Sequence, residues 1–418
     1  MFANKGVAFF NSQVRQLRIG GYNVLWKKIL KTLDLITFVP IVILFLPVII
    51  FVRLIKPFFL IRFGSLMFGR IGHYILMTEL LLQEIDAGLR PRGFDFFYER
   101  SADVCNKQAQ RIWRRILKVS PIVRYFTAGN RVIPGYKDHS IIFPNDRDVH
   151  DLLHNSKPYF SLSREEEDFG WREMDKIGIS KNERFVCFHA RDPAYLKVTQ
   201  SAFDWAYHNC RDSKIETYLP ATEELTRRRY FCIRMGAVVE KPINGDNDRI
   251  VDYAVKHRTD FLDIFILSKC FFFLSSSGGI FNIPMLSKRP ILWVNFLPIQ
   301  YAFTWSENSM FVPKKLWSRK EQRVLTFREI FKEDLSYIYS SHEFAARGID
   351  VVDNTPEEIF AATCEMDDRL NGRWIESDSD RELQKMFWSI FRADPKLHGK
   401  MRIRIGSDFL KDNIDLLN

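Results

Sequence analysis

The sequence predicts an α/β fold built on a parallel sheet. From about residue 183 to residue 296, apolar runs of strand length alternate with segments of helical pattern, which is typical of a parallel sheet covered by helices on both faces. Several of the apolar runs end on polar or small residues, and ligands of such sheets bind beyond the carboxyl ends of the strands. At 418 residues the chain is long for one core and suits two domains with an appendage.

The first feature in chain order is an uncharged apolar run of eighteen residues, from Leu35 to Val52. A helix of this length would span about 27 Å, close to the minimum for a bilayer. Pro40 and Pro47 interrupt the run, and basic residues flank both of its ends. Because basic flanks prefer the cytoplasmic side, we expect a kinked, re-entrant hairpin with both ends in the cytoplasm. The alternatives are a single-pass span and a buried hairpin of a soluble protein.

A second observation also points to a membrane. Residues 1–78 contain ten basic residues and one acidic residue, whereas the remaining chain is nearly neutral within a net charge of +10. The excess charge therefore lies beside the most apolar segment, as in a membrane-surface anchor, and this excludes a nucleic-acid groove. Four residues upstream of the run share one helical face and predict an interfacial helix: Trp26, Ile29, Leu30 and Leu33. We expect residues 1–57 to form the anchor.

The cysteines indicate a reducing compartment. Six are scattered along the chain without a C-x-x-C pair, so neither a disulfide framework nor a zinc site is predicted. Three D-x-D triplets, a short pattern of carboxylates that can hold a metal, begin at Asp146, Asp246 and Asp378. None follows an apolar strand, so we expect three solvated turns, no metal and no cofactor.

The segment 58–170 has the pattern of a first Rossmann-like domain. An apolar run leads into a glycine-bearing loop, Gly64 to Gly72, and a helical pattern follows. The glycine spacing is not G-x-G-x-x-G, so dinucleotide binding is not supported. Residues 171–345 carry the regular strand and helix alternation and form the second Rossmann-like domain. Residues 346–418 are expected to form helices that pack back on the body.

The strand ends of the second domain form the predicted site. Arg191 and Arg234 each follow a strand, and a small-residue turn follows another at Ser275, Ser276, Ser277, Gly278 and Gly279. Guanidinium forks and exposed backbone amides both bind phosphate oxygens, so this set predicts a diphosphate site. The alternatives are an ordinary β–α turn and surface ion pairs.

Short motifs across residues 58–390 resemble a group of bacterial glycosyltransferases with the two-domain GT-B architecture. They are "FGRIGH", "FHARD", "IETYLPATEEL", "RMG", "DFLDIFILSKC" and "SSSGG". The first is similar to a loop of protein O-fucosyltransferases, "FHAR" is similar to their H-x-R motif, and "SSSGG" is similar to the donor loop of heptosyltransferases. His73 stands where the fucosyltransferase loop has Asn.

This resemblance implies two Rossmann-like domains that face a cleft, with the N-terminal domain for the acceptor and the C-terminal domain for a nucleotide-sugar donor. It places Arg70 and Gly72 on the acceptor side of the cleft. A general base is required, for which a histidine or carboxylate is suited, and the candidates are His73, His189 and Asp192. For His73 the alternative is a helix-capping or core histidine.

The resemblance also implies a function. We expect a metal-independent glycosyltransferase that moves a sugar from a nucleotide-diphosphate donor to a glycan or lipid-linked acceptor. Its setting would be bacterial cell-surface polysaccharide or lipopolysaccharide synthesis, at the cytoplasmic face of the inner membrane. The alternatives are a nucleotide-sugar epimerase of the same fold and a non-catalytic membrane adaptor.

Overall fold

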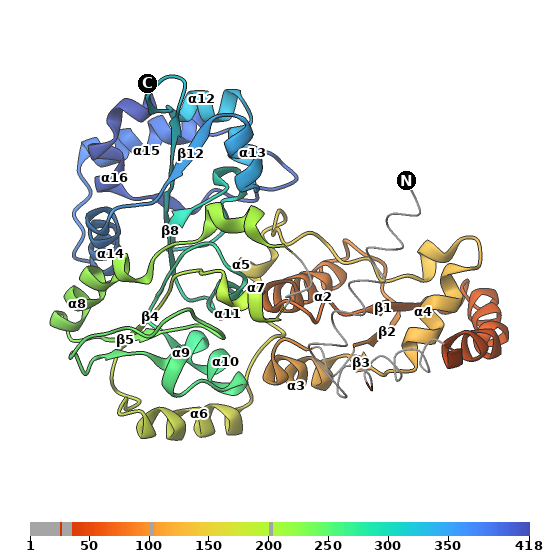
Figure 1. Ribbon diagram of the computed structural model, residues 1–418. Helices are drawn as coiled ribbons and strands as arrows, with labels where there is room; N and C mark the ends of the chain where they lie inside the picture. Colours follow the sequence, from red (N-terminus) through yellow and green to blue (C-terminus); the bar gives the residue numbers. More distant parts are fainter. Residues whose placement is uncertain (1–25, 27–35, 100–103, 200–203) are drawn as a thin grey trace. The chain divides into compact units, whose positions relative to one another are not determined.

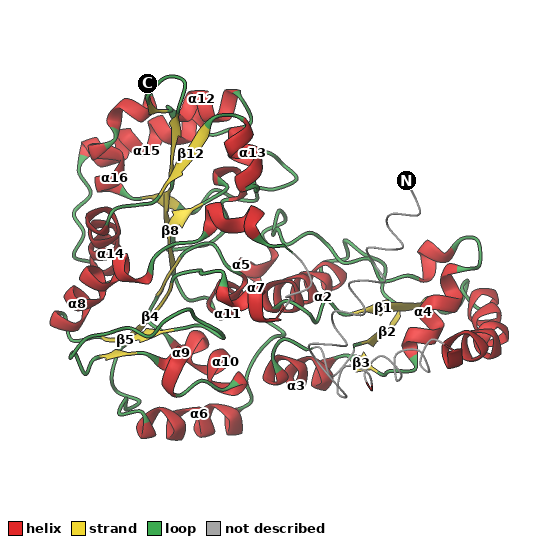
Figure 2. Cartoon of the chain, in the orientation of Figure 1, coloured by secondary structure: helices red, strands yellow, loops and turns green. Residues whose placement is uncertain are grey.

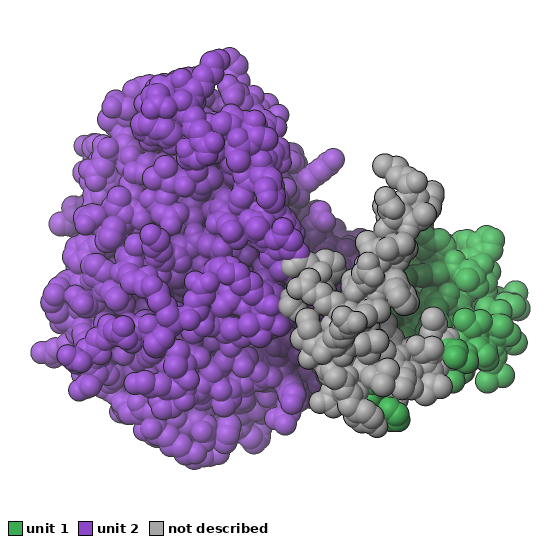
Figure 3. Space-filling model, viewed as in Figure 1, with its two compact units in different colours: residues 1–66, 92–100, 117–142 green, residues 67–91, 101–116, 143–418 purple. Residues whose placement is uncertain are grey.

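The computed structural model describes residues 26, 36–99, 104–199 and 204–418. These residues form two compact units (Figure 3). Unit 1 comprises residues 1–66, 92–100 and 117–142, and unit 2 comprises residues 67–91, 101–116 and 143–418. The units do not follow the domain boundaries expected at residues 57, 170 and 345, because the helical segments 67–91 and 101–116 belong to the larger unit.

Unit 2 is built on a seven-stranded parallel sheet of order β13-β9-β8-β7-β4-β5-β6 (Figure 1). The first six strands in chain order therefore follow the Rossmann order 3-2-1-4-5-6, and β13 is added at one edge. The strands are β4 (Phe185–His189), β5 (Phe231–Arg234), β6 (Ile250–Val251), β7 (Phe273–Ser275), β8 (Ile291–Phe296), β9 (Met310–Pro313) and β13 (Arg404–Ile405). Each strand predicted between residues 183 and 296 is confirmed.

Helices cover both faces of this sheet (Figures 1 and 2). On one face lie α8 (Leu219–Arg227) and α14 (Pro356–Leu370), and on the other lie α10 (Asp260–Lys269) and α11 (Asn282–Leu286). The remaining helices of the unit are α2 (Thr78–Asp86), α3 (Lys107–Ile116), α5 (Leu152–Asn155), α6 (Arg164–Lys176), α7 (Ala194–Thr199), α9 (Tyr253–Lys256), α12 (Phe327–Lys332), α13 (Ser341–Ala346), α15 (Asp378–Ile390) and α16 (Ser407–Asp412).

Short helices and a small antiparallel sheet complete unit 2. The sheet has the order β11-β10-β12, from β10 (Lys315–Ser318), β11 (Arg323–Val324) and β12 (Ile349–Val352). One turn of π-helix, η1 (His73–Met77), precedes α2, and the 3₁₀ turns are η4 (Ala206–Arg211), η5 (Ile215–Tyr218), η6 (Gly279–Phe281), η7 (Ile299–Tyr301), η8 (Leu335–Tyr337) and η9 (Ile414–Leu417).

Local sequence signals fix several of these helices. Ser163 and Glu166 form a capping box at the start of α6, and Thr355 and Glu358 form another at α14. In each box the hydroxyl accepts an amide of the first turn while the carboxylate accepts the cap's own amide, so two otherwise unpaired donors are satisfied. Helices were expected over residues 346–418, and α14 confirms one of them.

Unit 1 is built on a three-stranded parallel sheet of order β1-β2-β3, from β1 (Ile61–Ser65), β2 (Phe94–Tyr98) and β3 (Lys118–Val119). It also contains α4 (Val123–Arg131) and the 3₁₀ turn η3 (Tyr136–His139). The sheet has the parallel pairing expected of residues 58–170. A complete second Rossmann-like domain facing a cleft stays a prediction.

The predicted apolar hairpin is wrong in its local geometry. Residues Ile36–Leu54 form one continuous helix, which passes through Pro40 and Pro47. An apolar helix tolerates proline where neighbouring groups satisfy the freed backbone carbonyl. This helix is long and apolar enough to cross a membrane, judged by length and composition. The interfacial helix expected over residues 26–33 lies outside the described residues, apart from Trp26.

Candidate functional site

A cavity of about 470 Å³ opens in unit 2 at the carboxyl ends of β4 and β7. The chain leaves β4 toward β5 on one side and returns to β7 on the other, so this is the switch point of the sheet, where ligands of doubly wound folds bind. The turns after β4, β7 and β8 line the cavity, together with η4 and the loop that begins at Arg70. All of these segments belong to unit 2.

The serines of the turn after β7 hold neighbouring turns in place. The Ser276 hydroxyl accepts the Arg191 amide at 2.8 Å, and the Ser276 amide donates to the His189 carbonyl at 3.2 Å. The Ser277 hydroxyl donates to the Leu297 carbonyl at 3.1 Å, which ties the turn to the segment after β8. Ser275 and Ser276 are fully buried. The serines thus fix the shape of the cavity wall, and of the three only Ser277 lines it.

Two glycines allow the loop before η1 to meet the turn after β7. A Cβ added to Gly72 would lie 2.9 Å from the Gly279 Cα, and one added to Gly279 would lie 3.0 Å from the Gly72 nitrogen. The Asn282 side-chain amide donates to the Gly72 carbonyl at 3.1 Å and closes this contact. Only glycine lets the two backbones approach so closely. The contact sets Arg70 and His73 at the cavity.

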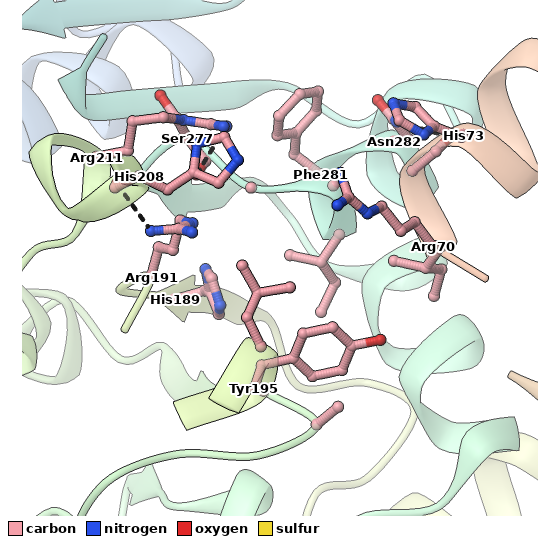
Figure 4. Close-up of a pocket in the computed structure, with 18 of the residues that line it drawn as sticks. Arg70, His73, His189, Arg191, Tyr195, His208, Arg211, Ser277, Phe281 and Asn282 are labelled. Carbon is pink, nitrogen blue, oxygen red and sulfur yellow. Dashed lines mark hydrogen bonds between the residues drawn. The ribbon is translucent and has the colours of Figure 1, made fainter. Parts of the chain in front are cut away.

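Five of the described arginines line the cavity, and the three labelled in Figure 4 are Arg70, Arg191 and Arg211. Arg191 forms an ion pair with Asp212 and donates to the His208 carbonyl at 3.3 Å. Arg211 reaches the Ser277 carbonyl at 3.5 Å. The guanidinium carbon of Arg70 lies 4.9 Å from the centre of the Trp205 ring. Within the described part of the chain, Arg70 and Arg211 have no acidic partner within ion-pair distance.

Three histidines line the cavity, and all have lowered pKa values. Burial, followed by Arg191 and Arg234, lowers the pKa of His189 to about 4. Burial, followed by the neighbouring arginines, lowers the pKa of His208 to about 4 as well. The pKa of His73 is also lowered, mainly by burial, although Asp146 opposes the shift. At neutral pH all three are uncharged imidazoles.

The carboxylates of the cavity differ in their partners. Asp192 accepts the Ala194 amide at 2.9 Å and the Glu240 amide at 3.3 Å. Asp263 pairs with Arg258 at 2.8 Å, and burial raises its pKa to about 6. The Asp263 carboxylate accepts hydrogen bonds from Tyr253 and Arg258. Asp146 lies 3.4 Å from the Arg147 guanidinium with a side chain 40% exposed.

Most of the predicted site residues meet at this cavity. Those that line it are Arg70, Gly72, His73, His189, Arg191, Asp192, Ser277, Gly278 and Gly279. Ser275, Ser276 and Arg234 do not line it. The Arg234 guanidinium is buried, donates to the Lys241 carbonyl at 2.8 Å and pairs with Asp252 at 3.3 Å. Arg234 is thus paired inside the protein, and the structure does not bring it to the cavity with the other predicted residues.

The sequence analysis missed Arg211, His208 and Asp146. Arg211 and His208 lie in η4, a 3₁₀ turn without an apolar period, so no pattern marked them. The D-x-D triplets are not all solvated turns, because Asp146 lines the cavity, and Asp148 and Asp380 are buried and accept backbone amides at helix starts. Among the described residues, no group of three or more His, Cys, Asp or Glu side chains is placed to hold a metal ion.

The chain matches no family model, and no curated protein matches its sequence. Four chains of solved structures match, among them the following two. One is the ADP-heptose LPS heptosyltransferase II of E. coli, with a TM-score of 0.33 and 8% identity over 56% of this chain and 84% of that one. The other is a glycosyl transferase family 9 protein of Veillonella parvula DSM 2008, with a TM-score of 0.39 and 8% identity over 68% of this chain and 92% of that one.

Proposed function

We propose that the protein is a glycosyltransferase that takes a sugar from a nucleoside-diphosphate donor and transfers it to a hydroxyl of a glycan or lipid-linked acceptor. The observation that carries the proposal is the arginine cluster at the switch point of the sheet. Arg70, Arg191 and Arg211 line one cavity, and among the described residues only Arg191 of these three has an acidic side chain, Asp212, within ion-pair distance.

The charge of this cluster calls for an anionic ligand. Burial lowers the pKa of Arg211, the sign of a cation held in an unfavourable environment. A buried charge without a partner costs stability, and such groups persist where a ligand compensates them. A diphosphate offers two phosphate groups with paired oxygens that match the guanidinium fork. Arg70, Arg191 and Arg211 then stabilise the charge that develops on the leaving nucleotide, a role that needs no metal.

Of the three candidate bases, His73 fits the task best. The acceptor hydroxyl must lose a proton near neutral pH, for which a neutral imidazole is suited. Asp146 raises the proton affinity of His73 and would stabilise the imidazolium once it forms. His189, with a pKa of about 4, is too weak a base, and the backbone amides hold Asp192. We assign the base to His73 and give Asp146 a positioning role.

The helix Ile36–Leu54 and the basic excess of residues 1–78 support the remaining part of the proposal. Together they favour attachment to an anionic membrane surface on the cytoplasmic side. An enzyme held there meets acceptors that are themselves anchored by a lipid. Synthesis of cell-surface polysaccharide or lipopolysaccharide is the process that we propose for it.

The test compares Arg211, which lines the cavity, with Arg234, which is buried and does not line it. Arg211→Met removes an unpaired cation, so the ligand-free protein should keep or raise its Tm, while the Kd for a nucleoside diphosphate rises at least about 10-fold. Arg234→Met breaks a buried pair and should lower stability by about 3 to 5 kcal/mol, with little change in nucleotide affinity of the folded fraction.

Titration calorimetry with UDP, GDP and ADP, with thermal melts of the same samples, measures both effects. Turnover is then followed with the matching nucleotide sugars. The proposal fails if no nucleoside diphosphate binds, or if both variants alter affinity equally.

A further inference from the structure

The helix Ile36–Leu54 is attached along its length to α4 of the same unit. Near its start, the Phe38 ring lies 5.2 Å from that of Tyr125, and about two turns further on the Phe45 ring lies 4.6 Å from that of Phe126. Toward its end, Ile49 is fully buried. The contacts therefore extend over several helical turns and hold one complete face of the helix against the folded unit.

The attachment is specific at the carboxyl end of α4. The Arg53 guanidinium donates to the Asn130 carbonyl at 3.1 Å, to the Asn130 side-chain oxygen at 2.7 Å and to the Ile133 carbonyl at 3.3 Å. Arg53 thus adds donors to backbone carbonyls at the carboxyl end of α4 and just beyond it. At Gly129 an added Cβ would lie 2.5 Å from the Ile49 side chain, so the two helices are in close contact there.

The opposite face of the helix is apolar and exposed. Its large side chains are between 45% and 72% exposed, and they are Ile36, Val39, Ile43, Leu44, Val48, Ile50, Phe51 and Leu54. At about 100° per residue these positions cover about half of the circumference. The next residues continue the surface, with Phe58 82% exposed. A continuous apolar surface of this kind marks a contact with lipid or with another protein.

The attachment to α4 is incompatible with a helix that crosses a bilayer. A crossing would carry α4 to the same depth, with Arg124, Asn130 and Arg131 among its residues. Charged and amide groups are strongly disfavoured in the hydrocarbon. A helix lying in the plane of the interface avoids this cost, because its free face enters the acyl boundary while α4 stays on the water side.

We infer that the helix Ile36–Leu54 binds flat along the surface of an anionic bilayer, with its exposed apolar face in the lipid and both ends on one side. The basic excess of residues 1–78 supplies the charge that attracts anionic headgroups. This inference deepens the membrane attachment in the proposed function and rests on that part of it. The expectation that both ends of the segment are cytoplasmic is kept, but an in-plane helix replaces the predicted hairpin.

Label depth tests the orientation. An environment-sensitive fluorophore is attached to one introduced cysteine in each of four full-length variants: Val39→Cys, Ile43→Cys, Ile50→Cys and Leu54→Cys. The parent chain, labelled in the same way, gives the background signal from the native cysteines. In vesicles of phosphatidylglycerol and phosphatidylethanolamine, lipid-borne quenchers at graded depths should place all four labels at one shallow depth. Labels at Ile43 and Ile50 deep in the bilayer, with those at Val39 and Leu54 near opposite surfaces, would show a crossing helix and overturn the inference.

Substitutions on the exposed apolar face of the helix test whether lipid covers that face. Ile43→Asp combined with Phe51→Asp should lower partition to these vesicles at least 10-fold, whereas Ile375→Asp, at a site 90% exposed in unit 2, should not. Labels that are shielded without lipid and unchanged by vesicles would show that a second copy or the preceding segment covers the face, and the inference would fail.

The two proposals fail separately. Nucleoside-diphosphate affinity measured on the same variants reports on the transferase proposal and not on the helix. Vesicle binding without nucleotide binding would remove the transferase and leave the in-plane helix.

Discussion

At the residue scale, position relative to the cavity decides what each charged side chain does. Arg211 and Arg234 are chemically identical, yet one faces a ligand-sized space and the other is paired with Asp252 inside the fold. The same division applies to the histidines, because burial and neighbouring arginines make His189 a poor proton acceptor while Asp146 opposes that shift at His73. Chemistry is therefore assigned by partners and not by residue type.

The lowered pKa of His189 predicts acid sensitivity. Its pKa falls from 6.5 to about 4 on folding, so between these pH values the unfolded chain binds a proton that the native protein does not. Stability contributed by this group is therefore present above pH 6.5 and lost as the pH falls toward 4. The loss of folding stability is at most about 3 kcal/mol, and it is smaller to the extent that water in the cavity screens the charge of the imidazolium.

Melting temperatures measured from pH 7 to pH 4 check this prediction. His189→Gln should flatten the decline of Tm over that range, whereas a substitution of the exposed His342 should leave the wild-type slope. An unchanged slope in His189→Gln would show that the imidazole is already protonated in the native protein.

At the scale of elements, the turn after β7 combines two functions. Its serines bind the neighbouring turns, and its glycines provide a close approach and an open wall. Gly278 has an extended backbone with φ −159°, and a Cβ there would meet only His189 at 3.5 Å, which is an ordinary contact. Gly279 has no such room, because the Gly72 backbone lies against it.

The two glycines therefore predict opposite phenotypes. Gly279→Ala should lower stability by about 1 to 3 kcal/mol, because the loop that carries Arg70 and His73 must shift. Gly278→Ala should keep the fold, while its methyl group enters the cavity and weakens nucleoside-diphosphate binding. Denaturant melts and calorimetry on both variants distinguish them, and a Gly279→Ala protein as stable as wild type would contradict the glycine contact.

At the scale of the whole molecule, the cavity and the apolar helix belong to different units. Unit 2 contains the cavity with all of its lining residues, and unit 1 contains the apolar helix with the face that we assign to lipid. The cavity obtains its positive charge from arginines, which stay charged in every condition that the protein tolerates. Under the proposed function, these permanent cations would stabilise the charge on the leaving diphosphate.

This source of charge predicts that transfer continues without divalent metal. Turnover of the donor is measured in about 5 mM EDTA, which is an excess over divalent metal present at about millimolar levels. The rate should remain within about two-fold of the untreated rate. The control adds Mn²⁺ back to the same sample. Activity that is abolished by EDTA and restored by Mn²⁺ would show that Asp146 and its neighbours hold a metal.

The sequence by itself determined the secondary structure of the Rossmann sheet, the location of the site at its strand ends and the apolar, basic character of the amino-terminal segment. Period, capping residues and strand-end chemistry are local properties, so Arg191 and Gly278 could be predicted from them to lie at the strand ends that line the cavity, whereas His73 was predicted from the resemblance of its loop. Only the tertiary structure separated Arg211 from Arg234, united residues 67–91 with the larger unit and attached the helix Ile36–Leu54 to α4. These outcomes depend on contacts between residues far apart in the chain, such as Arg53 with Asn130, and no local pattern encodes which distant partner a side chain finds.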